Sequence, residues 1–188
     1  MLLATSLVGV GHLPPTTRSR LTQDMVSILD GSTPEPSQKV MAAQVMAELQ
    51  LSEGRLDEAL RLAESSAQQA DQIGVKPAHV AALVLQLRIL LRLDRPTDVI
   101  VLADEVLSVA EKMSYRPMIW RIRAARAQAL RALGDDTEAA AEYQRAASTV
   151  RELAEAISDK ELKSNFLARA FGTAMITEAH GRAASEDG

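Results

Sequence analysis

Two arginine-bearing stretches of this sequence have the residue types that bind carboxylate or phosphate groups. Guanidinium groups form paired hydrogen bonds with such anions. The predicted helices 78–93 and 117–133 carry arginines and no acidic residue, whereas the helices that follow them are acidic. If the arginine-bearing helices line one face, that face is positive despite a net charge of −4. The candidates for binding an acidic segment, a C-terminal carboxylate or a phosphorylated partner are Arg88, Arg92, Arg121, Gln128 and Arg131.

These arginines also have a purely structural interpretation, in which they pair with acids on adjacent helices and bind nothing else. A second candidate site is apolar, because Met25, Met41 and Met46 can converge between the first two predicted hairpins. Methionine side chains adapt to apolar ligands, although ordinary core filling is the alternative. Trp120, the single tryptophan, is either a packing residue or an exposed anchor for a partner.

Catalytic and metal chemistry are not predicted. The sequence has no cysteine, no phosphate-binding G-x-x-x-x-G-K-[ST] loop and no G-x-S-x-G nucleophile motif. The three histidines, His12, His79 and His180, lie far apart in the sequence and lack partners at metal-ligand spacing. We therefore expect no catalytic residue, no metal, no cofactor and no enzyme activity.

Composition favours a helical chain. Of the 188 residues, 47% are apolar and only 3% aromatic, and alanine and leucine dominate. The acidic balance favours neither nucleic acid nor an anionic membrane surface. The apolar run 1–10 has no preceding Lys or Arg, and it is shorter than the ~20 residues of a membrane span. We expect a cytoplasmic chain in which this run forms a short helix, 2–12, on the first repeat.

A fixed spacing organises the chain. Gly54, Asp94 and Gly134 stand at evenly spaced turns, and their period of about 40 residues is typical of stacked helical hairpins. We predict one helical-repeat domain, 1–180, that forms an all-α, right-handed solenoid of antiparallel hairpins. Thr16 or Thr17 and Ser37 are the predicted caps of the helices that follow them. The hairpins are expected at about 1–30, 38–73, 78–114 and 117–157, with a capping helix at 160–179 anchored by Phe166 and Phe171, and a disordered tail at 181–188.

Residues around the turns resemble the tetratricopeptide repeat. The pattern is a small residue seven positions before the turn, then alanine, an aromatic residue and alanine in the second helix. The match is full around Gly134, lacks the aromatic residue around Gly54 and is weak around Asp94. Around Gly134 the residues are Ala127, Ala139, Tyr143 and Ala146. Around Gly54 they are Ala47, Ala59, Ala63 and Ser66, and around Asp94 they are Leu87, Val99, Ala103 and Val106.

Two features depart from that family. The spacing of the turns is longer than the period of about 34 residues usual there, and Arg123 and Arg126 occupy positions expected to pack. Either their stems cover apolar neighbours while their charged ends reach water, or the register differs locally. The long period and the closing stretch 158–167 are similar to the C-terminal repeats of bacterial signalling ATPases and maltose-regulator-type transcription activators. In those proteins, this resemblance implies, the repeats receive an effector or partner and control the ATPase.

The favoured hypothesis is a non-catalytic protein- or peptide-binding regulatory or scaffold module, which receives its partner in a concave groove of the arginine-bearing helices. One alternative is a small-molecule effector sensor that uses the groove or the methionine gap. A third is a homodimerisation module, in which exposed end hairpins stack on a second copy. Salt dependence distinguishes the first two, because binding of an acidic peptide weakens with salt whereas binding of an apolar effector does not.

Overall fold

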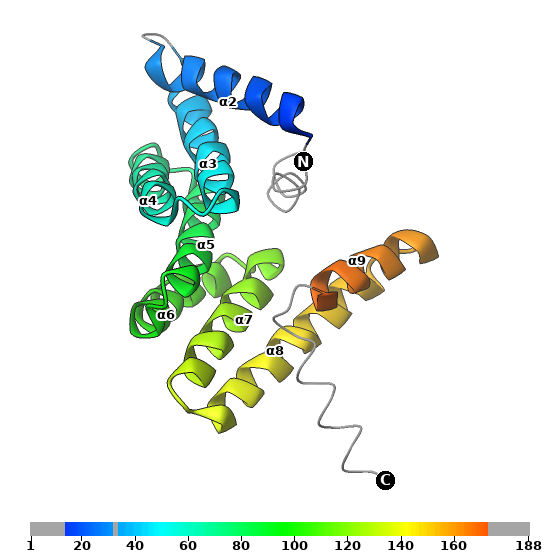
Figure 1. Ribbon diagram of the computed structural model, residues 1–188. Helices are drawn as coiled ribbons and strands as arrows, with labels where there is room; N and C mark the ends of the chain where they lie inside the picture. The colour runs from blue at the N-terminus through cyan, green and yellow to red at the C-terminus, as the bar shows by residue number, and fades with distance from the viewer. Residues whose placement is uncertain (1–13, 32–33, 173–188) are drawn as a thin grey trace. The chain divides into compact units, whose positions relative to one another are not determined.

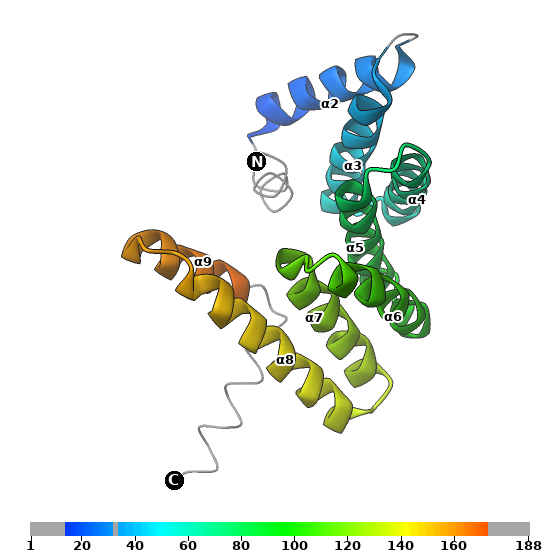
Figure 2. The same ribbon diagram turned by 180° about the vertical axis from the view of Figure 1, so that it is seen from behind.

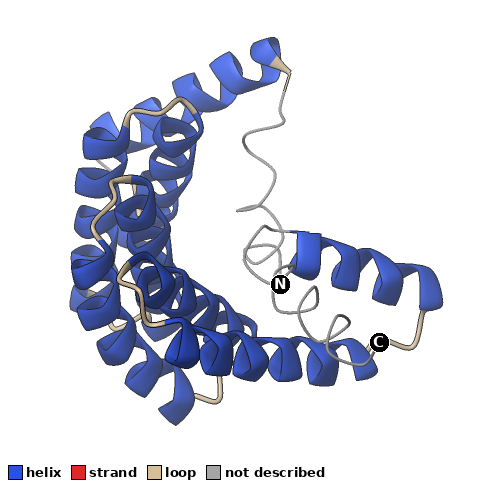
Figure 3. Ribbon diagram, turned by 60° about the horizontal axis from the view of Figure 1, so that its bottom comes forward, coloured by secondary structure: helices blue, strands red, loops and turns tan. Residues whose placement is uncertain are grey.

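The computed structural model describes residues 14–31 and 34–172, and within these ranges the chain forms eight α-helices and no strand (Figures 1 and 3). The all-α prediction is therefore confirmed for the described part of the chain. The predicted helix 2–12 and the tail 181–188 lie outside it. The helices are α2 (Pro15–Asp30), α3 (Pro36–Ser52), α4 (Leu56–Gln72), α5 (Lys76–Arg92), α6 (Pro96–Lys112), α7 (Arg116–Ala132), α8 (Asp136–Glu155) and α9 (Lys160–Gly172).

The helices repeat at half of the period read from the sequence. From α3 to α7 each helix has 17 residues, and from α4 to α8 each helix starts 20 residues after the one before it. Every intervening turn contains one residue with a positive φ. These residues are Gly54, Gly74, Asp94, Ser114 and Gly134. The turns within hairpins and those between hairpins are thus built alike.

Backbone hydrogen bonds explain why these turns need a left-handed residue. After α3, the N–H of Arg55 donates to the carbonyl of Gln50 at 2.9 Å, and the N–H of Gly54 donates to that of Leu51 at 3.2 Å. This pair of bonds is the Schellman motif, which satisfies the last carbonyls of a helix only when the intervening residue is left-handed. A Cβ at Gly54 would meet nothing within 4 Å, so the backbone angle, rather than space, favours glycine.

Two predicted helix caps were wrong. Helix α3 starts at Pro36, and its cap is Glu35, whose backbone N–H donates to the side chain of Gln38 at 3.3 Å in a reciprocal capping box. Helix α2 starts at Pro15, before both threonines proposed as its cap. The N–H groups of the first helical turn have no acceptor within the helix, so a proline there, which lacks an N–H, loses no hydrogen bond. The prolines are therefore the first residues of these helices instead of preceding them.

The chain forms two compact units, one up to Leu93 and one from Asp94 onwards. Unit 1 contains α2 to α5 and unit 2 contains α6 to α9. The single domain 1–180 and its hairpin 78–114 stay predictions, because that hairpin takes one helix from each unit. The other predicted hairpins, 38–73 and 117–157, correspond to α3–α4 in unit 1 and α7–α8 in unit 2.

Unit 1 is held together by small residues and by side chains that bond to buried carbonyls. Helix α4 packs on both α3 and α5, and α3 also contacts α5. One core cluster comprises Ala47, Leu51, Ala59, Ala63, Leu85 and Ile89. The amide of Gln86 donates to the carbonyl of Ala63 at 3.2 Å, and the hydroxyl of Ser66 donates to that of Val40 at 3.1 Å. Alanines let the helix axes approach closely, which brings these polar groups within reach.

Helix α2 departs from the regular pattern. It packs on α3, but none of its residues is buried. The residue after it, Gly31, is extended at φ −63° and ψ 143°, so the left-handed turn of the later repeats is missing here. Figures 1 and 2 show α2 running at a wide angle to α3. The second part of the predicted hairpin 1–30 is present as α2, whereas its residues 1–13 lie outside the described residues.

Unit 2 has its main apolar cluster where α7, α8 and α9 meet. Its buried members are Trp120, Ala124, Ala146, Ala147, Val150 and Ala170, and Phe166 and Leu167 of α9 pack against them. Phe166 is therefore an anchor of α9, as predicted, while the side chain of Phe171 lies outside the described residues. Leu162, expected on the same side, is 62% exposed because it lies in the first turn of α9, before the helix reaches the cluster.

Candidate functional site

The predicted arginines of unit 1 differ in their surroundings. Arg88 on α5 forms an ion pair with Glu48 of α3, whose side chain is only 5% exposed. Glu48 lies on α3, the first helix of the hairpin 38–73. The structural interpretation had instead paired these arginines with acids on the acidic second helices of the hairpins. A buried carboxylate needs such a cation, so Arg88 has a clear structural role. Arg92 is exposed in the last turn of α5, where a positive charge is favourable near the helix C-terminus.

The predicted arginines of unit 2 stack on aromatic rings. The guanidinium carbon of Arg121 lies 5.2 Å from the ring centroid of Trp120, and that of Arg131 lies 5.0 Å from the ring centroid of Tyr143. Gln128, on the same helix α7, is half-buried. A guanidinium group that lies over an aromatic ring is held there by cation–π attraction, which restricts the conformations of the arginine side chain.

Tyr143 is buried, and burial raises the pKa of its phenol above the ordinary value of ~10. The nearby Arg131 acts in the opposite direction, through its charge and a hydrogen bond, and offsets part of that rise in pKa. The pair therefore combines a neutral buried phenol with a cation at its face.

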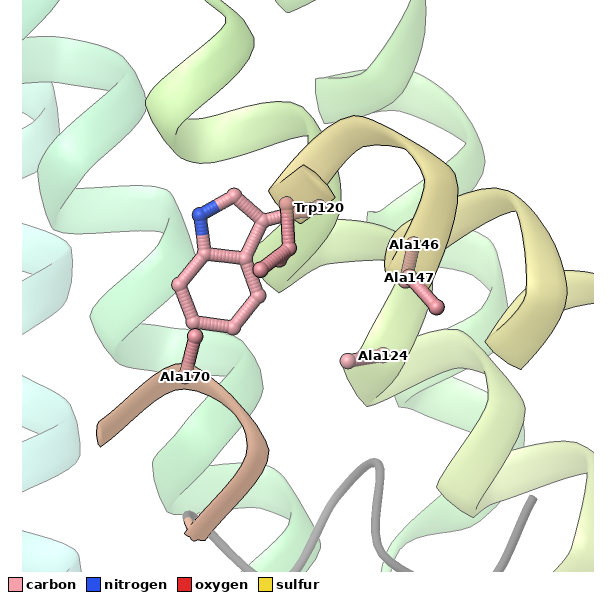
Figure 4. Close-up of a cluster of buried hydrophobic side chains, with 6 residues drawn as sticks. Trp120, Ala124, Ala146, Ala147 and Ala170 are labelled. Carbon is pink, nitrogen blue, oxygen red and sulfur yellow. The ribbon is translucent and has the colours of Figure 1, made fainter. Parts of the chain in front are cut away.

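Trp120 has a packing role, which settles the alternative that the sequence left open. Its side chain sits in the core of unit 2, and the whole residue is 7% exposed. Figure 4 shows Ala170 of α9 beside the six-membered ring. A partner has little access to a ring covered in this way, so Trp120 is not an exposed anchor.

The predicted methionine pocket forms only in part. Met46 lies in a cluster with Leu49, and Met25 of α2 packs against it together with Leu21 and Leu29. Met41 is 39% exposed and is not a member of this cluster. Although it shares α3 with Met46, five residues rotate it to another face of the helix. The convergence of all three methionines was therefore wrong.

The most densely bonded polar group of unit 2 was not among the predicted site residues. Glu142 of α8 is 3% exposed, accepts hydrogen bonds from Arg123 and Arg145, and forms an ion pair with Arg126. The closest is Arg145, whose Nη1 lies 2.6 Å from Glu142 Oε1. Arg123 Nη1 lies 3.2 Å from Oε2, and Arg126 Nη1 lies 3.5 Å from Oε1. We call Arg123, Arg126, Glu142 and Arg145 the Glu142 cluster.

Further carboxylates surround the Glu142 cluster. Arg123 Nη2 lies 2.7 Å from Glu111 Oε1, and Arg126 Nε lies 2.8 Å from Asp104 Oδ1, both on α6. Glu138 of α8 accepts from Arg126 and from Arg145, each at 3.4 Å. The ends of Arg123 and Arg126 are thus bonded to acids of both neighbouring helices, an arrangement that neither sequence-based interpretation of these arginines included.

Electrostatics keep these arginines charged. For Arg126, burial lowers the pKa, but its bond and charge interaction with Asp104, together with Glu142 and Glu138, raise it above the ordinary value overall. For Arg145, the hydrogen bond and charge of Glu142, supported by Glu138, raise the pKa despite some desolvation. Guanidinium groups held in this state donate hydrogen bonds and neutralise charge, and they do not transfer protons.

The described part of the chain also bears on metal binding and on the histidines. Residues 14–31 and 34–172 contain no group of three or more His, Cys, Asp and Glu side chains that could hold a metal ion. His79 Nδ1 lies 2.9 Å from the carbonyl of Ala67, a contact between α5 and α4. His12 and His180 lie outside the described residues.

Searches against known proteins found no family whose model matches this sequence and no curated protein that is similar to it. Among the described residues, no helix combines the length and the apolar character needed to cross a membrane. Function therefore has to be argued from the site itself.

Proposed function

We propose that this chain is a non-catalytic module that binds a protein or an acidic peptide, built as a right-handed, tetratricopeptide-like solenoid. The observation that carries the proposal is the regular register of equal-length helices joined by left-handed turns. Repeat arrays of this kind stabilise themselves through neighbouring helices and leave an extended face available for partners. The resemblance to the repeats of bacterial signalling ATPases supports a regulatory role within a larger protein.

The proposed contact residues in unit 2 are Arg121, Gln128 and Arg131 of α7. Arg121 and Gln128 are seven residues apart and so lie on one stripe of the helix, and Arg131 follows one turn later. The two arginines are separated by ~15 Å along the axis, a span that several residues of an extended peptide cover. Stacking on Trp120 and Tyr143 orients the guanidinium groups before a partner arrives, which lowers the entropic cost of binding.

In unit 1 the proposal rests on Arg92, which is exposed, more than on Arg88, which already neutralises Glu48. The separation of Met41 from Met25 and Met46 gives the apolar effector hypothesis less support than the acidic peptide. We therefore retain the arginines of α5 and those of α7, each within its own unit, as the proposed contact residues.

The test is fluorescence anisotropy with a fluorescein-labelled octaglutamate peptide, titrated at 20 to 500 mM NaCl. We expect binding that weakens steeply with salt, since the contacts are between exposed charges. Arg121→Gln and Arg131→Gln should each weaken binding about tenfold, the equivalent of ~1.4 kcal/mol for one charged hydrogen bond.

The matched control is Arg61→Gln, which removes an equal charge from α4 at a side chain that is 72% exposed. An octalysine peptide of the same length controls for non-specific association. Failure of octaglutamate to bind at 20 mM salt would refute the proposal, as would equal losses of affinity in the Arg61 and Arg121 variants.

A further inference from the structure

The Glu142 cluster stands where another hairpin has an apolar contact. One period of the sequence is the step from Gly54 to Asp94. Arg126 lies two periods after Met46, and Glu142 lies two periods after Leu62. In unit 1, Met46 and Leu62 pack in the same apolar cluster. In unit 2 the equivalent contact is ionic, with Arg126 Nη1 3.5 Å from Glu142 Oε1. Equivalent positions of the two hairpins thus form an apolar contact in unit 1 and an ion pair in unit 2.

Apart from this cluster, α7 and α8 are less distinctive, because most of their buried residues are alanines. These include Ala125, Ala127, Ala139, Ala147 and Ala154. Helix α4 carries a similar stripe at Ala59, Ala63, Ala67 and Ala70. Small, uniform side chains permit close packing but hardly distinguish one helix from another, and exchange between similar units is a common error of repeat proteins.

The outer ion pairs do not remove this ambiguity. Asp104 and Glu111 of α6 correspond, one period earlier, to Glu64 and Asp71 of α4, which are also acidic. Glu142 is different, because its counterparts one and two periods earlier are Leu102 and Leu62. Of these three equivalent positions, which lie on α4, α6 and α8, only the one on α8 carries an acid that is buried against α7.

We propose that the Glu142 cluster determines helix pairing, by directing α7 onto α8 and excluding exchange with the α3–α4 hairpin of a second copy. If α7 packed on α4 in such an exchange, Arg126 would face Leu62 in place of Glu142, although Glu58 stands at the position equivalent to Glu138. If α8 packed on α3, Glu142 would be buried opposite Met46, would lose both arginines of α7 and would keep only Arg145 of its own helix. A buried charge that loses partners is unfavourable, whereas a correctly paired one is tolerated. The inference is independent of what the module binds.

The test transfers the apolar contact of unit 1 into unit 2 with the double variant Arg126→Met, Glu142→Leu. The remaining charges keep partners, because Arg123 retains Glu111 and Arg145 retains Glu138. Each protein is unfolded in urea, refolded at 1 and 100 μM, and measured by circular dichroism and by light scattering after size exclusion. We expect the unmodified chain to recover its starting mass distribution. The double variant should recover its helicity but gain a species of twice the mass, increasing at the higher concentration.

Two further variants sharpen the test. Asp104→Asn with Glu111→Gln removes the outer acids and should refold to the distribution of the unmodified chain. Glu142→Gln keeps the shape of the side chain without its charge and should show the exchange in smaller proportion. Recovery of the unmodified distribution by both Glu142 variants would overturn the proposal. So would a double variant that does not regain its helicity, since the same apolar pair already serves α3 and α4.

Discussion

Arg145 holds the carboxylate of Glu142 at 2.6 Å from the adjacent turn of the same helix, while Arg123 and Arg126 approach it from α7. The side chain of Glu142 is 4% exposed, whereas that of Arg145 is 52% exposed. Arg145 therefore contacts both the solvent and the buried acid. Glu142 depends on Arg123 and Arg145 for the hydrogen bonds that water would otherwise supply, and Arg126 adds a third positive charge beside it.

Removing this carboxylate should destabilise the chain. We expect Glu142→Ala to lower the free energy of unfolding by ~2–3 kcal/mol, less than the ~3–5 kcal/mol typical for breaking a buried pair, because the arginines keep other acids. Urea unfolding measures the loss. Formate at 100 mM should restore part of it specifically in this variant, since a small carboxylate can occupy the vacated position and bind the folded state.

Glu138→Ala is the matched control on the same helix. Its side chain is 42% exposed, so its ion pairs should contribute less than ~1 kcal/mol, and formate should have no specific effect. An equal loss of stability in the two variants would contradict the central role of Glu142.

The left-handed turns give opposite predictions for two substitutions. Gly134 has φ 86°, so Gly134→Ala should cost ~1 kcal/mol of stability through backbone strain. Ser114 has φ 52° without being glycine, and Ser114→Gly should stabilise the chain by up to ~1 kcal/mol. Both effects are measured as shifts of the urea midpoint.

The control for Ser114→Gly is the same replacement at Ser108, an exposed position inside α6. There glycine should destabilise by about 0.5 kcal/mol, because it lowers helix propensity. A loss of stability at both serines would show that Ser114 carries no strain.

Much of the fold was predictable because helix boundaries depend on local chemistry. Gly54 and Gly134 mark turns that need a positive φ, and the apolar spacing between them is helical. The shorter repeat of single helices was missed because Ser114 fills one left-handed position and because Gly74 was not matched to Gly54. Propensity gives no sign that a serine will adopt that conformation; the hydrogen bonds of the turn impose it.

The Glu142 cluster was harder to predict because its residues come from two helices, α7 and α8, and its outer acids from a third, α6. Arg123 and Arg126 were noticed at positions expected to pack, and that was the available signal. The acid that accounts for them lies on α8, beyond the turn at Gly134 and among several other glutamates. Only the packing of α7 on α8 distinguishes Glu142 from Glu138, since the first is buried and the second is half-exposed.

Alkaline pH should destabilise the chain through Tyr143. Its folded-state pKa is raised by burial, so its contribution to stability is complete below the unfolded pKa of ~10 and is lost as the pH rises through the folded value. The urea midpoint should therefore fall above pH 10, and less so in Tyr143→Phe. Arg131→Gln removes a group that lowers the pKa of Tyr143, so the phenol absorbance at 295 nm should titrate at still higher pH. Titration at a lower pH in that variant would contradict the assigned effect of Arg131.

The single tryptophan reports whether α9 is docked. Ala170 is 3% exposed beside Trp120, so Ala170→Glu should bury a charge, displace α9 and expose the indole ring. We expect the fluorescence emission of Trp120 to shift to longer wavelength, while circular dichroism retains most of the helicity because α3 to α8 do not depend on this contact. The control is Ala168→Glu, two residues away on an exposed face of α9, which should leave the emission unchanged. An unshifted spectrum in Ala170→Glu would mean that α9 does not cover the ring in solution, and Phe166 would then lose its role as the anchor of this helix.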